Sequence, residues 1–348
     1  MKKLNPDGEN LAAVLISKRN IIIKKLNDPI LKENHVRVKI VKSAICGTQI
    51  GEWAMNRGID HFLPHCLGHE AVGYIIEIGE KITKFSVGDR VIVSWMKNIN
   101  NKQDDPPIFY EKNTNQLINF GECCTFVTRG VFPENRVYKI DNTITNNTAA
   151  LLGCAFLTAY SAIKLATKDF TNVKNKIAII GAGGVGLATA ILAESYNIEC
   201  ICVDISKVIT ELKKINSKIE FIDIESIKKY YLSFNTVIIC TGNKDGFELA
   251  QNLLHKNSGN IFIVGNPPYG EKIGIEIKAL LYGRKIIGVG EKDLQLPLDL
   301  MNLIELVKIG KLDAEKLIRK TYSMSDIQEA FEFNETGMGG RILIDIDI

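Results

Sequence analysis

The sequence has little net charge and little cysteine. Its 348 residues carry 43 Lys and Arg against 40 Asp and Glu, a formal charge of +3, with no block of like charges. This balance supplies no basic face for nucleic acid. Disordered and collagen-like classes are excluded by a composition that is 46% hydrophobic and 24% charged. Eight cysteines are too few for a disulfide scaffold, so in a reducing compartment we expect them to be packed, metal-bound or catalytic.

Long apolar segments are also missing. The first residues, MKKLNPDGENLAAVLISKRN, open with a basic pair followed by charged and turn-forming residues, unlike a signal peptide. The longest apolar runs, such as 177–180 and 237–240, have the length of strands, whereas a membrane-spanning helix needs about 20 residues. We therefore expect a cytosolic protein with no membrane partner and no nucleic-acid partner.

The first third of the chain is predicted to be β-rich. Residues 35–46 alternate apolar and polar side chains, as a half-buried strand does, and 71–79 and 87–95 are further strand candidates. The stretch 96–119 is rich in asparagine and contains two adjacent prolines. We interpret it as an exposed lobe or long loop.

The rest of the chain alternates short apolar runs with longer amphipathic segments. The short runs KIAII, IECICVD, IEFIDI, NTVIICTG, NIFIVG and KIIGVG are separated by segments long enough for helices, such as ATAILAESYN and GFELAQNLLH. This alternation predicts an α/β fold with a doubly wound parallel sheet. After about residue 291, two amphipathic helices and a final strand, RILIDIDI, are expected to return to the first domain. The predicted bounds are 1–155 and 291–348 for the β-rich domain and 156–290 for the parallel-sheet domain.

A glycine-rich turn follows the first of these runs. The residues Gly181-Ala182-Gly183-Gly184-Val185-Gly186 stand between a predicted strand and a predicted helix, as G-x-G-x-x-G. Such a turn permits a tight bend, lets a pyrophosphate approach the backbone and lets helix and strand pack closely. Asp204 ends the next predicted strand, 23 residues after Gly181, where an acid binds the adenosine ribose and favours NAD over NADP. The pattern alone is weak, since a plain glycine turn and a surface helix cap would also explain it.

Cys46, His69 and Cys154 are separated by 23 and 85 residues, so no local spacing rule joins them. Each alone is compatible with ordinary core packing. The ordered series CGTQIGEW, LPHCLGHEAVG, VGDRV, AALLGCAFLTAY, GAGGVG, VGNPP and GGRILI nevertheless resembles the zinc-dependent medium-chain alcohol dehydrogenases over nearly the whole chain. The resemblance implies a GroES-like β-rich domain made from both termini, with a Rossmann NAD-binding domain inserted.

The resemblance also implies one catalytic zinc held by Cys46, His69 and Cys154, with Glu70 beside the metal. Two thiolates and an imidazole leave a fourth tetrahedral position open. An alcohol there becomes more acidic and can pass hydride to nicotinamide.

Further positions carry over in the same way. Thr48 matches the hydroxyl that takes the substrate proton. Thr158 and Val185 match contacts to the nicotinamide or its ribose, Val264 a contact to the carboxamide, and Arg341 a contact to the pyrophosphate. Trp95 matches the position of an aromatic wall of the substrate pocket. Trp53 is a weaker candidate for the same role, because core packing explains it equally well. Three residues near the zinc segment are interpreted as loop and pocket residues, with Cys66 kept as an alternative zinc ligand: His61, His65 and Cys66.

The chain departs from the family pattern at several positions. Residues 95–122 contain no cysteine, so we expect no structural zinc, and the adjacent Cys123 and Cys124 cannot replace a four-cysteine set. Gly51 occupies the place of a relay histidine, and Gln49 that of a frequent acid. Proton exit must therefore use water or another group such as Glu52.

Three hypotheses remain at this point. The first is a zinc- and NAD-dependent dehydrogenase acting on an alcohol, polyol or sugar-like alcohol, as a homodimer or homotetramer. The second is a zinc-free enoyl or quinone-type reductase on the same fold, and the third is a non-catalytic binding protein. Relatives of the second kind lack the cysteine ligands, so the cysteines favour the first hypothesis.

Overall fold

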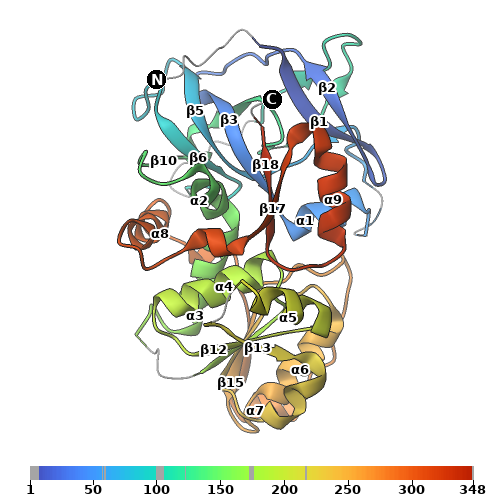
Figure 1. Cartoon of the computed structure of the whole chain (residues 1–348), viewed down its shortest axis with the longest axis vertical. Coiled ribbons are helices and arrows are strands. Elements are labelled where there is room, and N and C mark those ends of the chain that lie inside the picture. Colours follow the sequence, from blue (N-terminus) through green and yellow to red (C-terminus); the bar gives the residue numbers. More distant parts are fainter. Residues whose placement is uncertain are drawn as a thin grey trace. The chain divides into compact units, whose positions relative to one another are not determined.

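The computed structural model describes residues 8–56, 58, 60–98, 106–121, 123–171, 176–215 and 218–346. These residues form two compact units (Figure 1). The first unit contains the described chain up to Cys154, together with Lys320–Glu335 and the residues from Ile342 onward. The second unit contains Ala155–Arg319 and Thr336–Arg341.

The first unit is built on antiparallel strand pairs. Its main sheet has the order β10-β6-β5-β3-β18-β17, with β9 also paired to β3, and a smaller sheet has the order β2-β1-β4. The three predicted strands are confirmed as β3, β5 and β6, whereas β1, β2 and β17 were not predicted. The strand bounds are β1 (Asn10–Ser17), β2 (Asn20–Leu26), β3 (His35–Ile45), β4 (His65–Cys66), β5 (Glu70–Ile78), β6 (Arg90–Ser94), β9 (Arg129–Pro133), β10 (Val137–Lys139), β17 (Ile318–Ser323) and β18 (Arg341–Asp345). The helices are α1 (Gly47–Trp53), α2 (Asn146–Leu151) and α9 (Ile327–Glu335), with short 3-10 turns at η1 (Glu134–Arg136) and η6 (Met324–Asp326).

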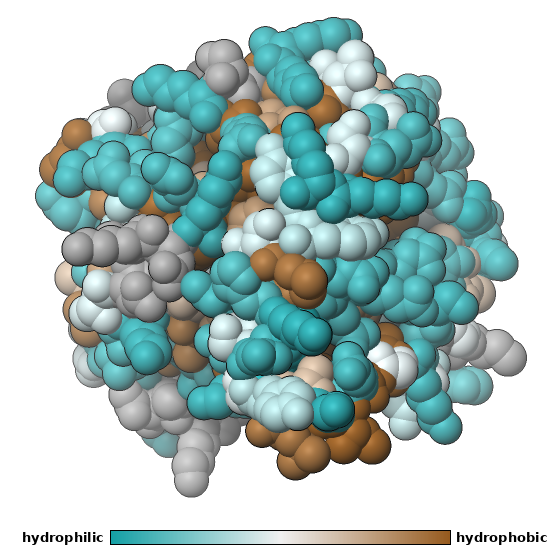
Figure 2. All heavy atoms as spheres, turned by 90° about the horizontal axis from the view of Figure 1, so that it is seen from below, coloured by the Kyte–Doolittle hydropathy of each residue, from teal (hydrophilic) through white to brown (hydrophobic). Residues whose placement is uncertain are grey.

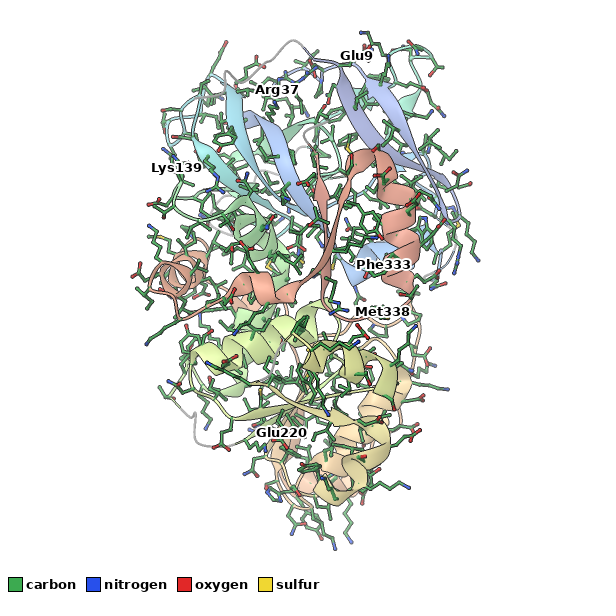
Figure 3. All side chains as sticks on the ribbon, viewed as in Figure 1. Glu9, Arg37, Lys139, Glu220, Phe333 and Met338 are labelled. Atoms are coloured by element: carbon green, nitrogen blue, oxygen red, sulfur yellow. The ribbon has the colours of Figure 1, made fainter. Side chains whose placement is uncertain are left out.

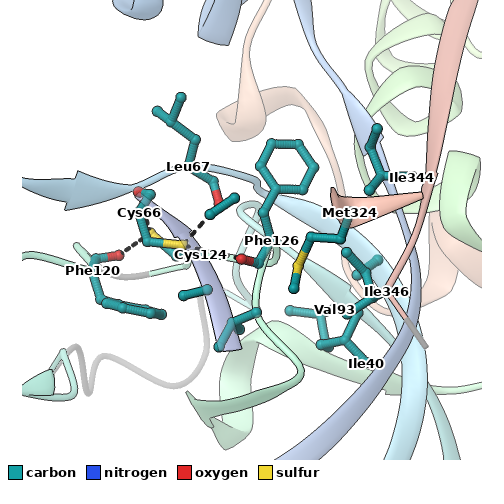
Figure 4. Close-up of a cluster of buried hydrophobic side chains, with 14 of the residues drawn as sticks. Ile40, Cys66, Leu67, Val93, Phe120, Cys124, Phe126, Met324, Ile344 and Ile346 are labelled. Carbon is teal, nitrogen blue, oxygen red and sulfur yellow. Dashed lines mark hydrogen bonds between the residues drawn. The ribbon is translucent and has the colours of Figure 1, made fainter. Parts of the chain in front are cut away.

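The core of this unit is apolar and contains thiols. Phe331 of α9 packs against Trp53 and Phe126, with ring centroids 5.8 and 6.0 Å apart. Figure 4 shows part of this cluster, in which the Cys124 thiol donates a hydrogen bond of 2.9 Å to the Cys66 carbonyl. Burial raises the pKa of the Cys124 thiol, so it stays protonated and packs as a small apolar group.

The described part of the 96–119 stretch is anchored in the same core. It contains a two-stranded ribbon, β7 (Phe109–Tyr110) paired with β8 (Leu117–Ile118). Phe109 and Ile118 are at most 1% exposed, and Phe109 stacks on Phe120 with ring centroids 3.7 Å apart. Most residues between 106 and 117 are nevertheless exposed, as expected for a lobe, and the buried Phe109, Ile118 and adjacent Phe120 anchor it to the core. Residues 99–105 lie outside the described residues.

The second unit is a parallel sheet with the strand order β13-β12-β11-β14-β15-β16. This is the 3-2-1-4-5-6 order of a doubly wound dinucleotide-binding sheet, and all six predicted strands are confirmed. The strand bounds are β11 (Ile177–Ile180), β12 (Cys200–Asp204), β13 (Glu220–Asp223), β14 (Thr236–Ile239), β15 (Gly259–Ile263) and β16 (Arg284–Gly288). The helices are α3 (Leu157–Ala166), α4 (Gly184–Ser195), α5 (Ser206–Lys213), α6 (Lys244–Leu253), α7 (Ile277–Leu281) and α8 (Leu298–Lys308), with 3-10 turns η3 (Ile224–Tyr230), η4 (Glu291–Asp293) and η5 (Ala314–Leu317).

The C-terminal tail is divided between the two units. Residues 291–319 belong to the second unit, so the boundary lies near 319 and not at the predicted 291. The physical reason is helix packing, because α8 lies on α3. The Lys164 ammonium of α3 stands 3.1 Å from the carboxylate of Asp299 on α8, and Asp299 is 2% exposed.

One helical segment is longer than any apolar run noticed in the sequence. By length and composition, the 21-residue segment Asn146–Ala166 could cross a membrane. However, 78% of its apolar window is buried inside the structure, which is the environment of a core helix. Its central turn, η2 (Leu152–Phe156), is a π-helix.

Ion pairs occupy the surface of both units. In the first, Arg37 and Lys139 each stand 2.7 Å from a carboxylate oxygen, of Glu77 and Asp89 respectively. In the second, Lys176 and Glu220 are 2.6 Å apart, and the hydrogen bond from Lys176 lowers the pKa of Glu220. Figure 3 labels Arg37, Lys139 and Glu220. Surface pairs contribute at most about 1 kcal/mol each, so the apolar cores supply most of the stability.

Candidate metal and coenzyme sites

Two thiols and an imidazole converge in the first unit. The ligand atoms of Cys46, His69 and Cys154 all lie within 4.8 Å of one another, and the Cys154 Sγ is 3.3 Å from the His69 Nε2. In a tetrahedral zinc site the sulfur–nitrogen separation is about 3.5 Å and the sulfur–sulfur separation about 3.8 Å, from the usual zinc–ligand bond lengths. The donor set therefore fits zinc in type and spacing. Among the described residues this is the one group of three or more potential ligands found.

Cys46 is held by the first turn of α1. It is the residue before the helix, and its backbone N–H donates a 3.0 Å hydrogen bond to the Oε1 of Gln49. The Gln49 N–H in turn donates to the Cys46 carbonyl at 3.0 Å. Gln49 is 1% exposed, so the side chain that replaces the expected acid caps the helix reciprocally. The sequence reasoning missed this role, although a Gln three residues after a potential cap residue is its signal.

His69 and Glu70 lie at the start of β5, at the point where β5 meets β6. The Trp95 N–H donates a 3.0 Å hydrogen bond to the His69 carbonyl, and the Ser43 hydroxyl donates one of 2.8 Å to the Glu70 carbonyl. The ring centroids of Trp95 and His69 are 6.2 Å apart. Glu70 is fully buried. The structure thus places Trp95 beside one candidate ligand, and the buried Glu70 follows that ligand in the chain.

Cys154 lies on the π-helical turn η2. Turns of π-helix are rare in proteins overall, and those that occur are often found at functional sites. Its neighbour Gly153 allows the turn to approach β6, because an added Cβ would stand 2.8 Å from the Val93 carbonyl oxygen and 3.4 Å from the Cβ of Glu70. The hydroxyl of Ser94 donates a hydrogen bond to the Gly153 carbonyl. Only a residue without a side chain brings Cys154 this close to the sheet.

Other predicted residues of this region lie around the cluster or away from it. Thr48 and Glu52 are half-buried residues of α1, and their spacing of four puts them on one face of the helix. Trp53 is 1% exposed in the core, which favours the core-packing interpretation over a place in the substrate pocket. Three further residues have other surroundings. His61 is exposed, and the His65 Nε2 is 2.5 Å from a carboxylate oxygen of Asp60. Cys66 is buried, with its thiol 3.5 Å from the Phe126 carbonyl oxygen.

The glycine turn of the second unit is shaped by close backbone approach. Gly181 has φ +93°, a conformation that favours glycine. At Gly186 an added Cβ would stand 1.7 Å from the Gly181 carbonyl oxygen, whereas at Gly183 nothing lies within 4 Å. The turn therefore leaves open space at Gly183, at the N-terminus of α4, where backbone N–H groups and the helix dipole favour an anion.

An arginine lies over this helix N-terminus. Arg341 is 2% exposed, and a Cβ on Gly184 would be 2.5 Å from its Nε. Gly340 is paired with Gly183 in a β-bridge, which brings the arginine to the turn. This packing explains why a fourth glycine, beyond the three of the motif, stands at position 184, a point that the motif alone did not reveal.

The remaining coenzyme candidates lie around the same edge of the sheet. The Asp204 carboxylate accepts hydrogen bonds from the Ala182 N–H at 2.6 Å and the Ile205 N–H at 2.7 Å. Val264 follows the end of β15. Carboxyl ends of parallel strands are where doubly wound sheets bind ligands. Two further candidates, half-buried on α4 and α3, are Val185 and Thr158.

Comparison with known proteins agrees with this geometry. Residues 32–143 match the family described as the Alcohol dehydrogenase GroES-like domain. An alcohol dehydrogenase from Geobacillus stearothermophilus is 27% identical over 353 residues, covering 95% of this chain and 97% of that protein. The chain is similar to alcohol dehydrogenases over nearly its full length. Its first unit is a GroES-like domain and its second a Rossmann domain.

Solved structures of this fold match over almost the full length. Benzyl alcohol dehydrogenase from Acinetobacter calcoaceticus superposes with a TM-score of 0.79 at 22% identity, covering 97% of this chain and 99% of that one. A putative zinc-binding dehydrogenase from Sinorhizobium meliloti bound to NADP has a TM-score of 0.75 at 18% identity, with the same coverage. At these identities the likeness establishes the fold alone, and the chain's own residues must decide the rest.

The close approach at the turn gives a testable prediction. We expect Gly186→Ala to lower the free energy of unfolding by about 2 kcal/mol or more, because the methyl group overlaps the Gly181 carbonyl. At an ordinary helix position the same change would stabilise by about 1 kcal/mol. Thermal unfolding without coenzyme measures the difference. Gly183→Ala is the matched control and should keep the melting temperature, and a Gly186→Ala protein as stable as the wild type would contradict the argument.

Proposed function

We propose that the chain is a zinc-dependent alcohol dehydrogenase that transfers a hydride between an alcohol and NAD, forming an aldehyde or ketone. The alcohol is a small molecule, a class that includes polyols and sugar-like alcohols. The observation that carries the proposal is the convergence of Cys46, His69 and Cys154 within 4.8 Å. We also propose that the protein is cytosolic.

The metal site of the proposal is a single zinc held by Cys46, His69 and Cys154. The buried Glu70 lies beside it, and no structural zinc is included, because residues 95–122 hold no cysteine. Zinc in this site would supply Lewis acidity, making an adjacent alcohol hydroxyl more acidic and a carbonyl more electrophilic. The protein positions two of the three ligands before any metal binds. The capped first turn of α1 holds Cys46, and the close approach of Gly153 to the sheet holds Cys154.

Thr48 is the proposed proton acceptor. Its hydroxyl lies two residues beyond Cys46, in the first turn of α1, and would take the proton that the alcohol loses as its hydride leaves. Glu52 lies one helical turn further along α1 and is half-buried. It is the side chain we propose to carry the proton onward where Gly51 replaces the relay histidine. Trp95, packed beside His69, is the proposed wall of the substrate pocket.

NAD is the proposed hydride acceptor, and it is proposed to bind at the carboxyl ends of the strands of the parallel sheet. The pyrophosphate is proposed to bind at the turn Gly181, Gly183, Gly184 and Gly186, opposite the guanidinium of Arg341. Asp204 binds the adenosine ribose. The nicotinamide end is assigned to Thr158, Val185 and Val264.

The metal assignment predicts the outcome of one substitution. Purified protein should contain one zinc per chain, and Cys46→Ser should lose both the zinc and at least about 100-fold in kcat for alcohol oxidation, because one of three ligands is gone. Atomic absorption and NADH formation measure the two effects. Cys123→Ser, outside the cluster, is the control and should keep both.

Two results would redirect this assignment. Protein without zinc that gains none on zinc addition would support the zinc-free enoyl or quinone-type reductase instead. Two zincs per chain would show a second metal site.

The coenzyme assignment depends on the charge of Asp204. We expect the wild type to bind NAD more tightly than NADP, because the carboxylate repels a 2′-phosphate. Asp204→Asn keeps an oxygen for the Ala182 N–H and removes the charge, so it should reduce the preference by about tenfold, which fluorescence titration with NADH and NADPH measures. Asp245→Asn, at an exposed position of α6, should leave the ratio unchanged. An unchanged ratio in Asp204→Asn would remove this residue from the recognition of the ribose.

We further propose that the protein is a homo-oligomer, either a dimer or a tetramer. Strand β16 is the edge of the parallel sheet, and beside it α7 exposes Ile277 by 74% and Leu281 by 81%. Figure 2, a view from below, shows a largely hydrophilic face with a group of apolar side chains at its lower edge. An open edge and exposed apolar side chains favour pairing with a second copy.

Light scattering after size exclusion tests this proposal. We expect Leu281→Asp to shift the protein toward monomer, because a charge would be buried at the interface. Ile30→Asp, at a position that is 88% exposed in the first unit, should leave the mass unchanged. A wild-type monomer, or an oligomer indifferent to Leu281→Asp, would overturn the assignment.

A further inference from the structure

The second unit contains a cavity at the edge of its sheet opposite to the proposed coenzyme site. Its volume is about 310 Å³, at the small end of the range for ligand pockets. It lies between the last turn of α3 and the amino-terminal ends of β14, β15 and β16, and residues of all four elements or their adjoining turns line it. The glycine turn and Asp204, in contrast, stand at the carboxyl ends of these parallel strands.

One wall of the cavity is a row of polar side chains. Thr236 is in register with Asn260, and Asn260 with Lys285, so the three side chains are neighbours on one face of the sheet. Both faces of a parallel sheet normally lie under helices and are apolar. In this sheet the next register partner of Thr236, on β11, is the apolar Ile177. The polar row is thus confined to the strands that line the cavity.

The charge of the lining is of one sign. Lys285 on β16 and Lys168 after the end of α3 both line the cavity, and no acidic residue does. Within the described residues, neither ammonium makes an ion pair, and the side chains of Asn260 and Thr236 make no hydrogen bond. Two cations, an amide and a hydroxyl therefore face a cavity with no anion from this part of the chain.

The rest of the lining is apolar. Leu165 comes from α3, and Phe262 and Ile287 stand two residues beyond Asn260 and Lys285 on the same sheet face. Phe262 is 3% exposed. A ligand that fits this lining has an anionic group at one end and a short apolar body at the other.

We propose that this cavity binds a small phosphate monoester with an apolar body. The two ammoniums suit a dianion, since charge-assisted hydrogen bonds are the stronger ones. The threonine hydroxyl and the asparagine amide supply further donors to phosphate oxygens, and the apolar wall covers the organic part. The proposal is independent of the catalytic assignment, because it shares no residue with either candidate site.

Hexyl phosphate is the probe, and isothermal titration of the full chain is the measurement. Saturating NAD is included so that the pyrophosphate position at Arg341 is occupied. We expect one site per chain in the wild type and a loss of affinity of at least about tenfold in the variant Lys168→Met/Lys285→Met, which keeps side-chain length and removes both charges. Hexanol should bind more weakly than hexyl phosphate, because it lacks the anion.

A matched variant separates local charge from net charge. Lys256→Met/Lys311→Met removes two exposed lysines of the same unit that do not line the cavity, and it should bind like the wild type. The single change Lys168→Met, away from β16, should weaken binding without touching the strand edge. No saturable binding to the wild type, or equal binding to the two double variants, would overturn the proposal.

Discussion

The candidate metal site depends on a close approach of backbone to backbone. Cys154 reaches His69 because Gly153 presents no side chain to the Val93 carbonyl. The sheet fixes the other two ligands, because Cys46 directly follows β3 and His69 directly precedes β5. Two ligands from a sheet and one from a helix can converge only while that contact is kept, and 108 residues of chain separate Cys46 from Cys154. The protein organises a compact donor set from segments that no local constraint joins.

The second unit uses glycine for the same purpose at a different place. Gly186 meets the Gly181 carbonyl, and Gly184 makes room for Arg341. In both units, then, the absence of a side chain permits a polar or metal-binding group to come near the backbone. The remainder of each unit, with its buried Phe331 cluster or its parallel sheet, supplies the rigidity that such contacts need. Each unit carries a separate part of the chemistry, with the donor cluster in one and the dinucleotide edge in the other.

The sequence predicted the architecture well because periodicity reports on burial. All six strands of the parallel sheet were found, since a two-sided buried strand is a short β-branched run. The exposure of the 106–117 stretch follows from its polar composition, but the same composition hides the side chains that anchor it, Phe109, Ile118 and the adjacent Phe120. The tail boundary was misplaced because an amphipathic pattern shows that α8 has an apolar face but not which helix receives it. Gln49 was noticed as a departure from a family pattern, yet its hydrogen bond to Cys46 depends on three-dimensional proximity that spacing only suggests. The convergence of the three ligands was inferred only through resemblance, since no property of the isolated residues joins them.

The π-helical turn at 152–156 also constrains how the chain can vary in length. A regular helix advances by about 100° per residue, so a π turn is in effect one residue inserted into the α-helical segment on either side of it. Deleting a residue there would restore an ordinary helix, but it would also rotate the flanking parts by about a quarter turn relative to each other. Either Cys154 would leave the cluster or the face that α3 presents to its own unit would be lost. Substitutions are tolerated in such a segment one side chain at a time, whereas a single-codon deletion would alter every contact beyond it at once.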